Sequence, residues 1–166
     1  TVRRTILAMN ENNESLAHPG KAFEDQPHQT WKEIRDYLGQ ETWDEWTKIA
    51  SVRNPWDQVV SRYYWNLETI TDMKQSFSDY VLSNDWVPWS ATEILYDGED
   101  LQVDDVIKME TIHEDIKRIL NVDFGFYENK GKLRPDSEWK KMYDDKTYNH
   151  VYDICYKEIE DFGYEY

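Results

Sequence analysis

The segment at residues 47–64 constrains the fold more than any other part of the chain. Thr47–Val52 is a short, mostly apolar run, as is typical of a buried strand. A helix is predicted directly after it, because Asn54 is a good N-cap, Pro55 suits the first helical position and Asp57 complements the positive helix end. The predicted helix has a broad apolar face, made by Val59, Val60, Tyr63, Tyr64 and Leu67.

Other helices are predicted from their caps and their apolar spacing. Thr30 and Glu33 form a capping-box pattern before a helix at Trp31–Leu38, and Gly39 ends it. Further helical segments are expected at Glu41–Glu45 (a short turn or helix), Phe77–Leu82, Ile112–Leu120 and Asp144–Phe162, with Gly163 ending the last.

The remaining segments are predicted to form an N-terminal helix, two irregular connections and a hairpin. Residues 1–9 are predicted to form a helix, since Val2, Ile6, Leu7 and Met9 can share one stripe. Residues 10–29 are expected to form a long loop, and residues 125–142 a basic, irregular connection. The Asp97-Gly98 pair predicts a hairpin, whose arms are expected at Glu93–Tyr96 and Leu101–Met109.

Strands alternating with helices predict the α/β class, as a three-layer α/β/α arrangement with a mostly parallel sheet. The sequence contains no repeats and no convincing linker, so residues 1–166 are expected to form one domain. The single cysteine, Cys155, excludes an intramolecular disulfide and is expected to be a small core residue.

The charge of the chain disfavours some partners. There are 34 acidic and 19 basic residues, which give a net charge of −15. Such a surface repels nucleic acid and anionic membranes, so neither is expected as a partner. The sequence has no apolar run long enough to span a bilayer and no visible signal peptide, and we therefore expect a cytoplasmic protein.

Arg53 is the leading candidate for a binding residue. It lies between the predicted strand and the N-terminus of the helix, where free N–H groups and the helix dipole favour an anion. A guanidinium matches phosphate well, and Ser61, two turns further along, can add a hydroxyl donor. The alternative is that Arg53 pairs with a neighbouring carboxylate.

The stretch Val52-Arg53-Asn54-Pro55-Trp56-Asp57, followed by Val60-Ser61-Arg62-Tyr63, resembles the 3′-phosphate-binding motif of sulfotransferases that use 3′-phosphoadenosine 5′-phosphosulfate (PAPS). Gln58 replaces the usual arginine of that motif. The resemblance implies that Arg53 and Ser61 bind the 3′-phosphate. It also implies a fold similar to P-loop nucleotide hydrolases.

Further segments match this family in the expected order, and the similarity covers residues 28–166. They resemble the Golgi-type and microbial carbohydrate sulfotransferases more than the cytosolic small-molecule branch. These segments are His28–Ile34, Asp104–Glu110 with Ile112 and Asp115, Asn129-Lys130 with Arg134, and Tyr143–Tyr164.

One departure lies at the start of the chain. Members of the family open with a strand and a glycine-rich loop containing lysine, which binds the 5′-phosphosulfate, and no such loop occurs here. Thr1–Arg4 resembles the beginning of the helix after that loop, which implies that Thr1 belongs to the nucleotide site. We expect the chain to be a fragment, and the other interpretation is a protein that has lost the loop.

The resemblance implies transfer of a sulfuryl group from PAPS to a hydroxyl or amine of a small-molecule or carbohydrate acceptor, without a metal. His28 is the candidate general base, with a loop or capping role as the alternative, and His18 comes second. His113 and His150 fall in predicted helices, and their spacing does not suggest a metal site.

The remaining candidates have two interpretations each. Lys130, Lys132 and Arg134 either close over the nucleotide or offset local acidity. The aromatic residues Trp86, Trp89 and Tyr64 either line a pocket or belong to the core. For the whole protein, the alternative function is a catalytically inactive nucleotide-binding or interaction protein with the same fold. A small kinase would need a Walker loop, which the sequence lacks.

Overall fold

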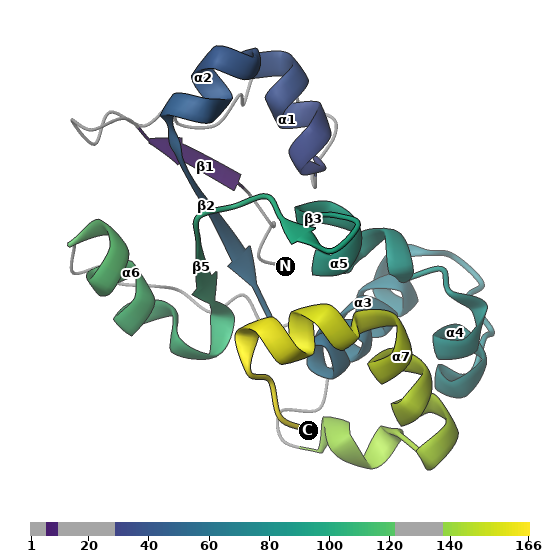
Figure 1. Cartoon of the computed structure of the whole chain (residues 1–166). Helices are drawn as coiled ribbons and strands as arrows, with labels where there is room; N and C mark the ends of the chain where they lie inside the picture. The colour runs from purple at the N-terminus through teal and green to yellow at the C-terminus, as the bar shows by residue number, and fades with distance from the viewer. Residues whose placement is uncertain (1–5, 10–28, 122–137) are drawn as a thin grey trace. The chain divides into compact units, whose positions relative to one another are not determined.

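The structure is a computed structural model that describes residues 6–9, 29–121 and 138–166. Helices alternate with short strands, and the mixed α/β class predicted from the sequence is confirmed. Figure 1 shows the elements, which are β1 (Ile6–Met9), α1 (Trp31–Leu38), α2 (Gln40–Glu45), β2 (Thr47–Val52), α3 (Pro55–Thr69), α4 (Phe77–Ser83), α5 (Ala91–Leu95), β3 (Tyr96–Asp97), β4 (Asp100–Leu101), β5 (Asp105–Lys108), α6 (Ile112–Leu120) and α7 (Asp145–Phe162), with 3₁₀ turns at Val87–Trp89, Met109–Thr111 and Trp139–Met142.

The described residues divide into two compact units. Unit 1 contains residues 53–92 and 138–166, and unit 2 contains residues 6–9, 29–52 and 93–121. Each unit is described by itself below. The expectation of one domain over residues 1–166 stays a prediction.

The sheet of unit 2 is built around β2. This strand pairs antiparallel with β1 and parallel with β5, with Ala50 opposite Ile6 on one side and Val106 on the other. Ile49 and Val52 are buried, as predicted for a strand inside the core. The small sheet therefore contains one parallel and one antiparallel pairing among the described residues.

Two predictions about strands were wrong. Residues 6–9 form a strand rather than a helix, because their apolar run gains hydrogen-bond partners along β2. The hairpin exists around Gly98 (φ +61°), but its strands contain two residues each. Glu93–Leu95 belongs to α5, and Asp105–Lys108 pairs with β2, where Ile107 is buried.

The capping predictions are confirmed for α1. The side chain of Thr30 accepts a hydrogen bond from the backbone N–H of Glu33, and the Glu33 carboxylate accepts one from the N–H of Thr30. Gly39 ends the helix with φ +84°. Trp31 then fixes the buried face of α1, because its indole Nε1 donates to the carbonyl of Tyr96 at 2.9 Å.

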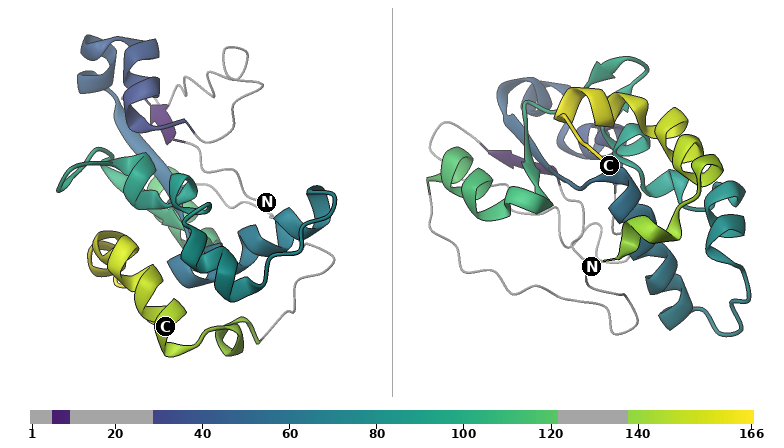
Figure 2. Two further views of the ribbon diagram at one scale, coloured as in Figure 1. Left: turned by 90° about the vertical axis from the view of Figure 1, so that its right-hand side faces the viewer. Right: turned by 90° about the horizontal axis from the view of Figure 1, so that it is seen from below.

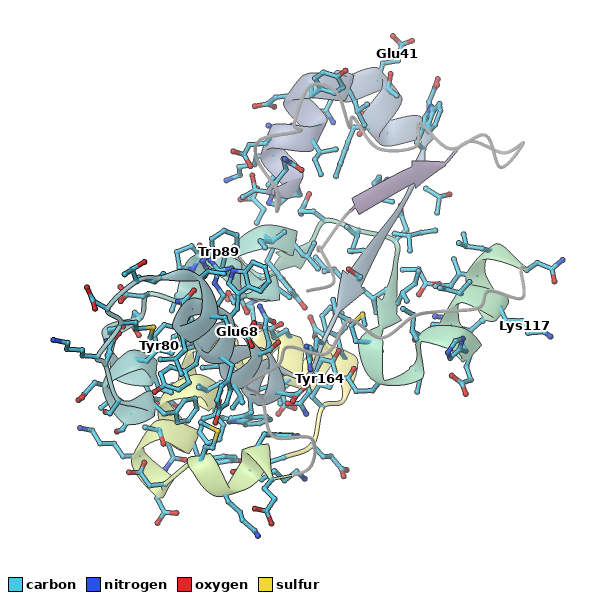
Figure 3. All side chains as sticks on the ribbon, turned by 180° about the vertical axis from the view of Figure 1, so that it is seen from behind. Glu41, Glu68, Tyr80, Trp89, Lys117 and Tyr164 are labelled. Carbon is cyan, nitrogen blue, oxygen red and sulfur yellow. The ribbon has the colours of Figure 1, made fainter. Side chains whose placement is uncertain are left out.

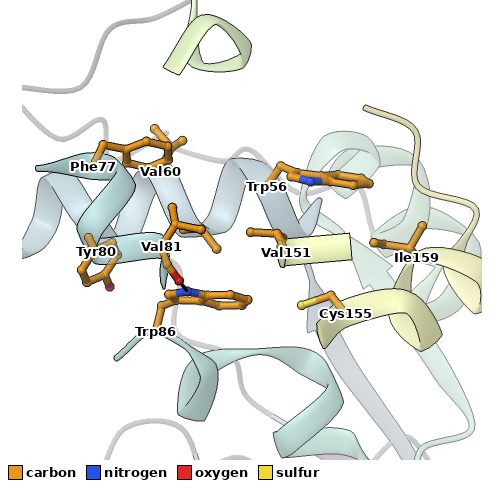
Figure 4. Close-up of a cluster of buried hydrophobic side chains, with 10 residues drawn as sticks. Trp56, Val60, Phe77, Tyr80, Val81, Trp86, Val151, Cys155 and Ile159 are labelled. Carbon is orange, nitrogen blue, oxygen red and sulfur yellow. Dashed lines mark hydrogen bonds between the residues drawn. The ribbon is translucent and has the colours of Figure 1, made fainter. Parts of the chain in front are cut away.

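Unit 1 is a helical unit in which α7 packs on α3 and α4. In the three views of Figures 1 and 2, α7 lies alongside these two helices. Its bounds confirm the prediction, with Asp144 as N-cap and Gly163 in the left-handed conformation after Phe162. Figure 4 shows the buried cluster, which consists of Trp56, Val59, Val60, Phe77, Tyr80, Val81, Trp86, Val151, Cys155 and Ile159.

The cluster satisfies the polar atoms of its large aromatic residues. The indole Nε1 of Trp86 donates to the carbonyl of Val81 at 2.8 Å (Figure 4). Cys155 is fully buried, which confirms its predicted place in the core.

Two segments predicted to be irregular lie largely outside the described residues. They are residues 122–137, most of the predicted basic connection, and residues 10–28 of the predicted loop. No helix among the described residues is long and apolar enough to cross a membrane.

The capping box of α1 yields a prediction about stability. Replacing Thr30→Ala removes the oxygen that accepts from the N–H of Glu33, and we expect it to lower the free energy of unfolding by about 1 kcal/mol. Thr30→Ser keeps that oxygen and should behave like the original protein. Urea unfolding followed by circular dichroism measures both. Equal losses in the two variants would contradict the role given to the side-chain oxygen.

The buried Tyr80 yields a prediction about alkaline pH. Burial, the main cause, raises the pKa of Tyr80 from its usual 10 to about 12, because the ionised phenolate is poorly solvated. Between these two pH values the unfolded chain releases the proton while the folded chain keeps it. Stability should therefore fall as pH rises, with Tyr80 contributing up to about 1.4 kcal/mol per pH unit.

The Tyr80→Phe variant isolates this contribution from that of the other tyrosines. Its free energy of unfolding, measured in urea from about pH 9 to about pH 12, should fall less steeply than that of the original protein. Identical slopes for the two proteins would show that Tyr80 does not titrate differently in the folded state.

Candidate functional site

The candidate site is organised by the first two turns of α3. Asn54 caps the helix, since its side-chain oxygen accepts from the N–H of Asp57 at 3.4 Å, and Pro55 occupies the first turn. Both features were predicted. The cap fixes where the helix begins. From there on, residues about four apart lie on the same face of the helix.

Arg53 and Ser61, predicted to share a ligand, do lie together. The Nη1 atom of Arg53 donates to the Oγ atom of Ser61 at 3.3 Å. The Nε atom of the same guanidinium donates to Oδ2 of Asp57 at 2.5 Å. Asp57 and Ser61 lie one turn apart on the same face of α3, and Arg53, which precedes the N-cap Asn54, contacts both of their side chains. We call Arg53, Asp57 and Ser61 the α3 row.

The α3 row contains both outcomes that the sequence left open for Arg53. The arginine pairs with a carboxylate, and it also reaches the serine hydroxyl. The side chain of Arg53 is 28% exposed and that of Asp57 is 13% exposed, so the ion pair is shielded from solvent but open at the arginine. The two described contacts use two of the five guanidinium N–H groups. The α3 row can therefore hold an anion at the open side of Arg53.

The first turn of α3 is held from behind by residues far along the chain. The Asn54 side chain donates through Nδ2 to the carbonyl of Glu165 at 2.9 Å. Trp56 stacks on Tyr148 with ring centroids 5.1 Å apart, and the hydroxyl of Tyr143 donates to the Trp56 carbonyl at 2.8 Å. Because the turn is anchored by these contacts, Arg53 projects from a rigid helix start.

A second group of side chains lies on the neighbouring face of α3. The guanidinium carbon of Arg62 lies 3.9 Å from the centroid of the Trp89 ring, and Gln58 donates from Nε2 to the Trp89 carbonyl. Figure 3 labels Trp89 and Tyr80, which flank this part of unit 1. Trp89 is thus tied to α3 by contacts that the sequence did not indicate. Trp86 is a core residue, and Tyr64 packs edge-on against Tyr63.

The other predicted site residues have different outcomes. His28, His18, Lys130, Lys132, Arg134 and Thr1 lie outside the described residues. His113 lies on α6 and is exposed, while Nε2 of His150 on α7 is 2.7 Å from Oδ1 of Asn84. Both positions agree with the predicted helices. Within the described ranges, no group of three or more side chains is suited to hold a metal ion.

Asp115, part of a segment used for the family resemblance, has a local structural role. It accepts hydrogen bonds from the N–H of Lys108 at 2.9 Å and from the hydroxyl of Thr111 at 2.9 Å. Arg118 pairs with Asp115 and also with Asp105 of β5. These contacts raise the pKa of Arg118 and lower the pKa of Asp105, chiefly through the hydrogen bonds between them. They join α6 to the strand.

Sequence reasoning missed two partners in this region. A carboxylate partner was an alternative for Arg53, but Asp57 was not identified as that partner, although its spacing of four from Arg53 is the signal of an ion pair. The contact between Asn54 and Glu165 joins residues 111 positions apart, and no local signal indicates it.

Comparisons of the chain with protein-family models, with curated proteins and with solved structures found no match. Function is therefore inferred from the α3 row and from the motif in the sequence.

The Asn54 cap yields a testable prediction. Asn54→Ala removes both the cap of α3 and the hydrogen bond to Glu165, and we expect the free energy of unfolding to fall by about 1–2 kcal/mol. Asn54→Ser keeps a capping oxygen but is too short for the Glu165 carbonyl, so an intermediate loss is expected. Urea unfolding measures both variants, and an unchanged Asn54→Ala protein would contradict the double role.

Proposed function

We propose that the protein is a sulfotransferase that moves a sulfuryl group from PAPS to a hydroxyl or amine of an acceptor. The hydrogen bond between Arg53 and Ser61 carries the proposal. These are the two residues that the sequence resemblance assigns to the 3′-phosphate. Their contact gives that assignment a physical basis, because one phosphate group can bind both of them.

The chemistry of the α3 row suits a phosphate at this position. Arg53 offers a permanent charge and planar donors, and Ser61 offers a hydroxyl donor. Asp57 holds the Nε side of the guanidinium, which leaves the opposite side for the ligand. The positive end of α3 adds to the attraction. A phosphate that binds here has to compete with Asp57 for the charge of Arg53, and this competition favours a ligand with two negative charges over a neutral one.

The finer fold is part of the proposal. We infer a three-layer, P-loop-like domain with a mostly parallel sheet. Its support is the parallel pairing of β2 with β5 and the direct passage from β2 to α3 along the chain. In such folds ligands bind where a strand ends and a helix begins.

The remaining roles come from the sequence resemblance. His28 is proposed as the base that takes the acceptor proton, while Lys130, Lys132, Arg134 and Thr1 are proposed to contact the nucleotide. In-line transfer needs the acceptor and the sulfuryl group to be aligned, and it needs donors for the charge that develops on the moving group. The sulfur–oxygen bond to the nucleotide breaks as the bond to the acceptor forms, and the acceptor proton passes to the base.

Calorimetric titration tests the donor site. We expect the protein to bind adenosine 3′,5′-bisphosphate more tightly than adenosine 5′-monophosphate, because only the former has the 3′-phosphate. Arg53→Ala should weaken bisphosphate binding at least about tenfold, which corresponds to the loss of a charge-assisted hydrogen bond. Binding of the monophosphate should change much less.

Arg35→Ala is a matched control, since it removes an arginine whose described ion pair is with Asp36 on α1. It should leave the preference for the bisphosphate intact. Equal binding of both nucleotides by the original protein, or an unchanged affinity in Arg53→Ala, would contradict the donor site. Bisphosphate binding without sulfuryl transfer to any acceptor would favour the inactive nucleotide-binding alternative.

A further inference from the structure

The segment that follows α7 packs against the first turn of α3. After Gly163 ends α7, the carbonyl of Glu165 accepts a hydrogen bond from Nδ2 of Asn54 at 2.9 Å. The oxygen of the same Asn54 side chain accepts from the N–H of Asp57 and caps α3. Because one amide group makes both contacts, the position of the Glu165 carbonyl affects how the cap is oriented.

Tyr166, the next residue, is held by aromatic neighbours. Its hydroxyl donates to the carbonyl of Lys140, and the residue is 37% exposed. Its ring lies edge-on to four other rings, whose centroids are 4.8 to 5.9 Å away and which belong to Trp56, Trp139, Tyr143 and Tyr148. A ring with these neighbours and a hydrogen-bonded hydroxyl has little rotamer freedom, so it also fixes the adjoining backbone of Glu165.

Trp56 connects this aromatic group to α3. It is the second residue of the helix and is 1% exposed. Its indole Nε1 donates to the carbonyl of Tyr148 at 3.2 Å, and its own carbonyl accepts from the hydroxyl of Tyr143 at 2.8 Å. The Tyr166 ring packs on all three of these residues. Tyr166 therefore supports the first turn of α3 through its side chain as well as through the neighbouring carbonyl.

The first turn determines where Arg53 meets its partners. The Arg53 guanidinium contacts the side chains of Asp57 and Ser61, so a shift of the turn moves Asp57 relative to the arginine. Asp57 is also near the aromatic group. Burial, the main cause, raises the pKa of Tyr143, and the neighbouring Tyr166 and Asp57 raise it further. The carboxylate that holds Arg53 is thus close to the residues that surround Tyr166.

We propose that Tyr166 is a positioning residue for the anion site at Arg53. Its ring fixes the Glu165 carbonyl, and this carbonyl orients the Asn54 cap. The capped turn then places Asp57 where it holds the Arg53 guanidinium. The identity of the ligand, a nucleotide with a 3′-phosphate, rests on the proposed function, whereas the positioning of Arg53 does not.

Hydrogen exchange in the free protein tests the positioning without any nucleotide. Nuclear magnetic resonance follows the exchange of the Nε–H groups of Arg53 and Arg62 with water, and each signal is assigned by its loss in the corresponding lysine variant. Tyr166→Ala should speed exchange at Arg53 at least about threefold, because its proton is released from Asp57 more often. Arg62 lies on the same helix and its Nε is buried, so it is an internal reference and should change much less.

Two further variants sharpen this measurement. Tyr166→Phe keeps the ring and should exchange at the original rate, which separates the ring from the hydroxyl. Tyr166→Leu keeps part of the apolar contact without a ring and should lie between Tyr166→Ala and the original protein. Circular dichroism establishes that each variant is folded. An unchanged rate at Arg53 in folded Tyr166→Ala or Tyr166→Leu, or an equal increase at Arg62, would overturn the positioning role.

Nucleotide binding tests the consequence of this positioning. Tyr166→Ala should weaken binding of adenosine 3′,5′-bisphosphate about three- to tenfold and leave binding of adenosine 5′-monophosphate nearly unchanged. In the Arg53→Ala background, Tyr166→Ala should cost no further affinity for the bisphosphate, since its effect passes through Arg53. Equal losses for the two nucleotides, or full additivity with Arg53→Ala, would contradict the proposal. If neither nucleotide bound, the proposed function would fail, and the exchange rates would still decide the role of Tyr166.

Discussion

The candidate site depends on the capped first turn of α3. Asn54 holds this turn with both ends of its amide: the oxygen accepts from the N–H of Asp57, and the nitrogen donates to the carbonyl of Glu165. Trp56 adds aromatic stacking on the α7 side of the turn. The anchored turn places Asp57 and Ser61, four residues apart on α3, where both contact Arg53, which precedes the helix.

The ion pair between Arg53 and Asp57 sets the conditions for ligand binding. An isolated arginine here would be long and flexible, and ordering it on binding would cost conformational entropy. Asp57 fixes the Nε edge of the guanidinium in advance, and the hydrogen bond to Ser61 fixes Nη1. The Asp57 carboxylate also repels an incoming anion. Preorganisation of Arg53 therefore raises the affinity for an anion, and this repulsion lowers it. A phosphate offsets the repulsion from Asp57 only if it binds both Arg53 and Ser61.

The sequence predicted the elements whose signals come from neighbouring residues. It did not predict contacts between residues far apart in the chain. The caps of α1 and α3 involve residues three apart and were predicted from Thr30 and Asn54. The last helix was expected to begin at Asp144, which the structure shows to be its N-cap. By contrast, residues 6–9 form a strand only because β2 lies beside them, and four apolar residues have no decisive period. The closeness of Arg53 and Ser61 was expected from the family resemblance, whereas the stacking of Arg62 on Trp89 depends on a turn 27 positions away and had no signal in the sequence.

The charge distribution of the chain gives the described arginines two kinds of surroundings. The large excess of acidic residues means that a cation near the surface usually meets a carboxylate, as Arg35, Arg53 and Arg118 do. An arginine avoids this only where apolar and neutral groups surround it, and Trp89, Tyr80 and Gln58 provide such surroundings for Arg62 and its stacking partner. Burial by these groups lowers the pKa of Arg62, because its charged form is poorly solvated there. Among the described arginines, Arg62 thus has an aromatic ring and a phenol as its neighbours where Arg35, Arg53 and Arg118 have a carboxylate.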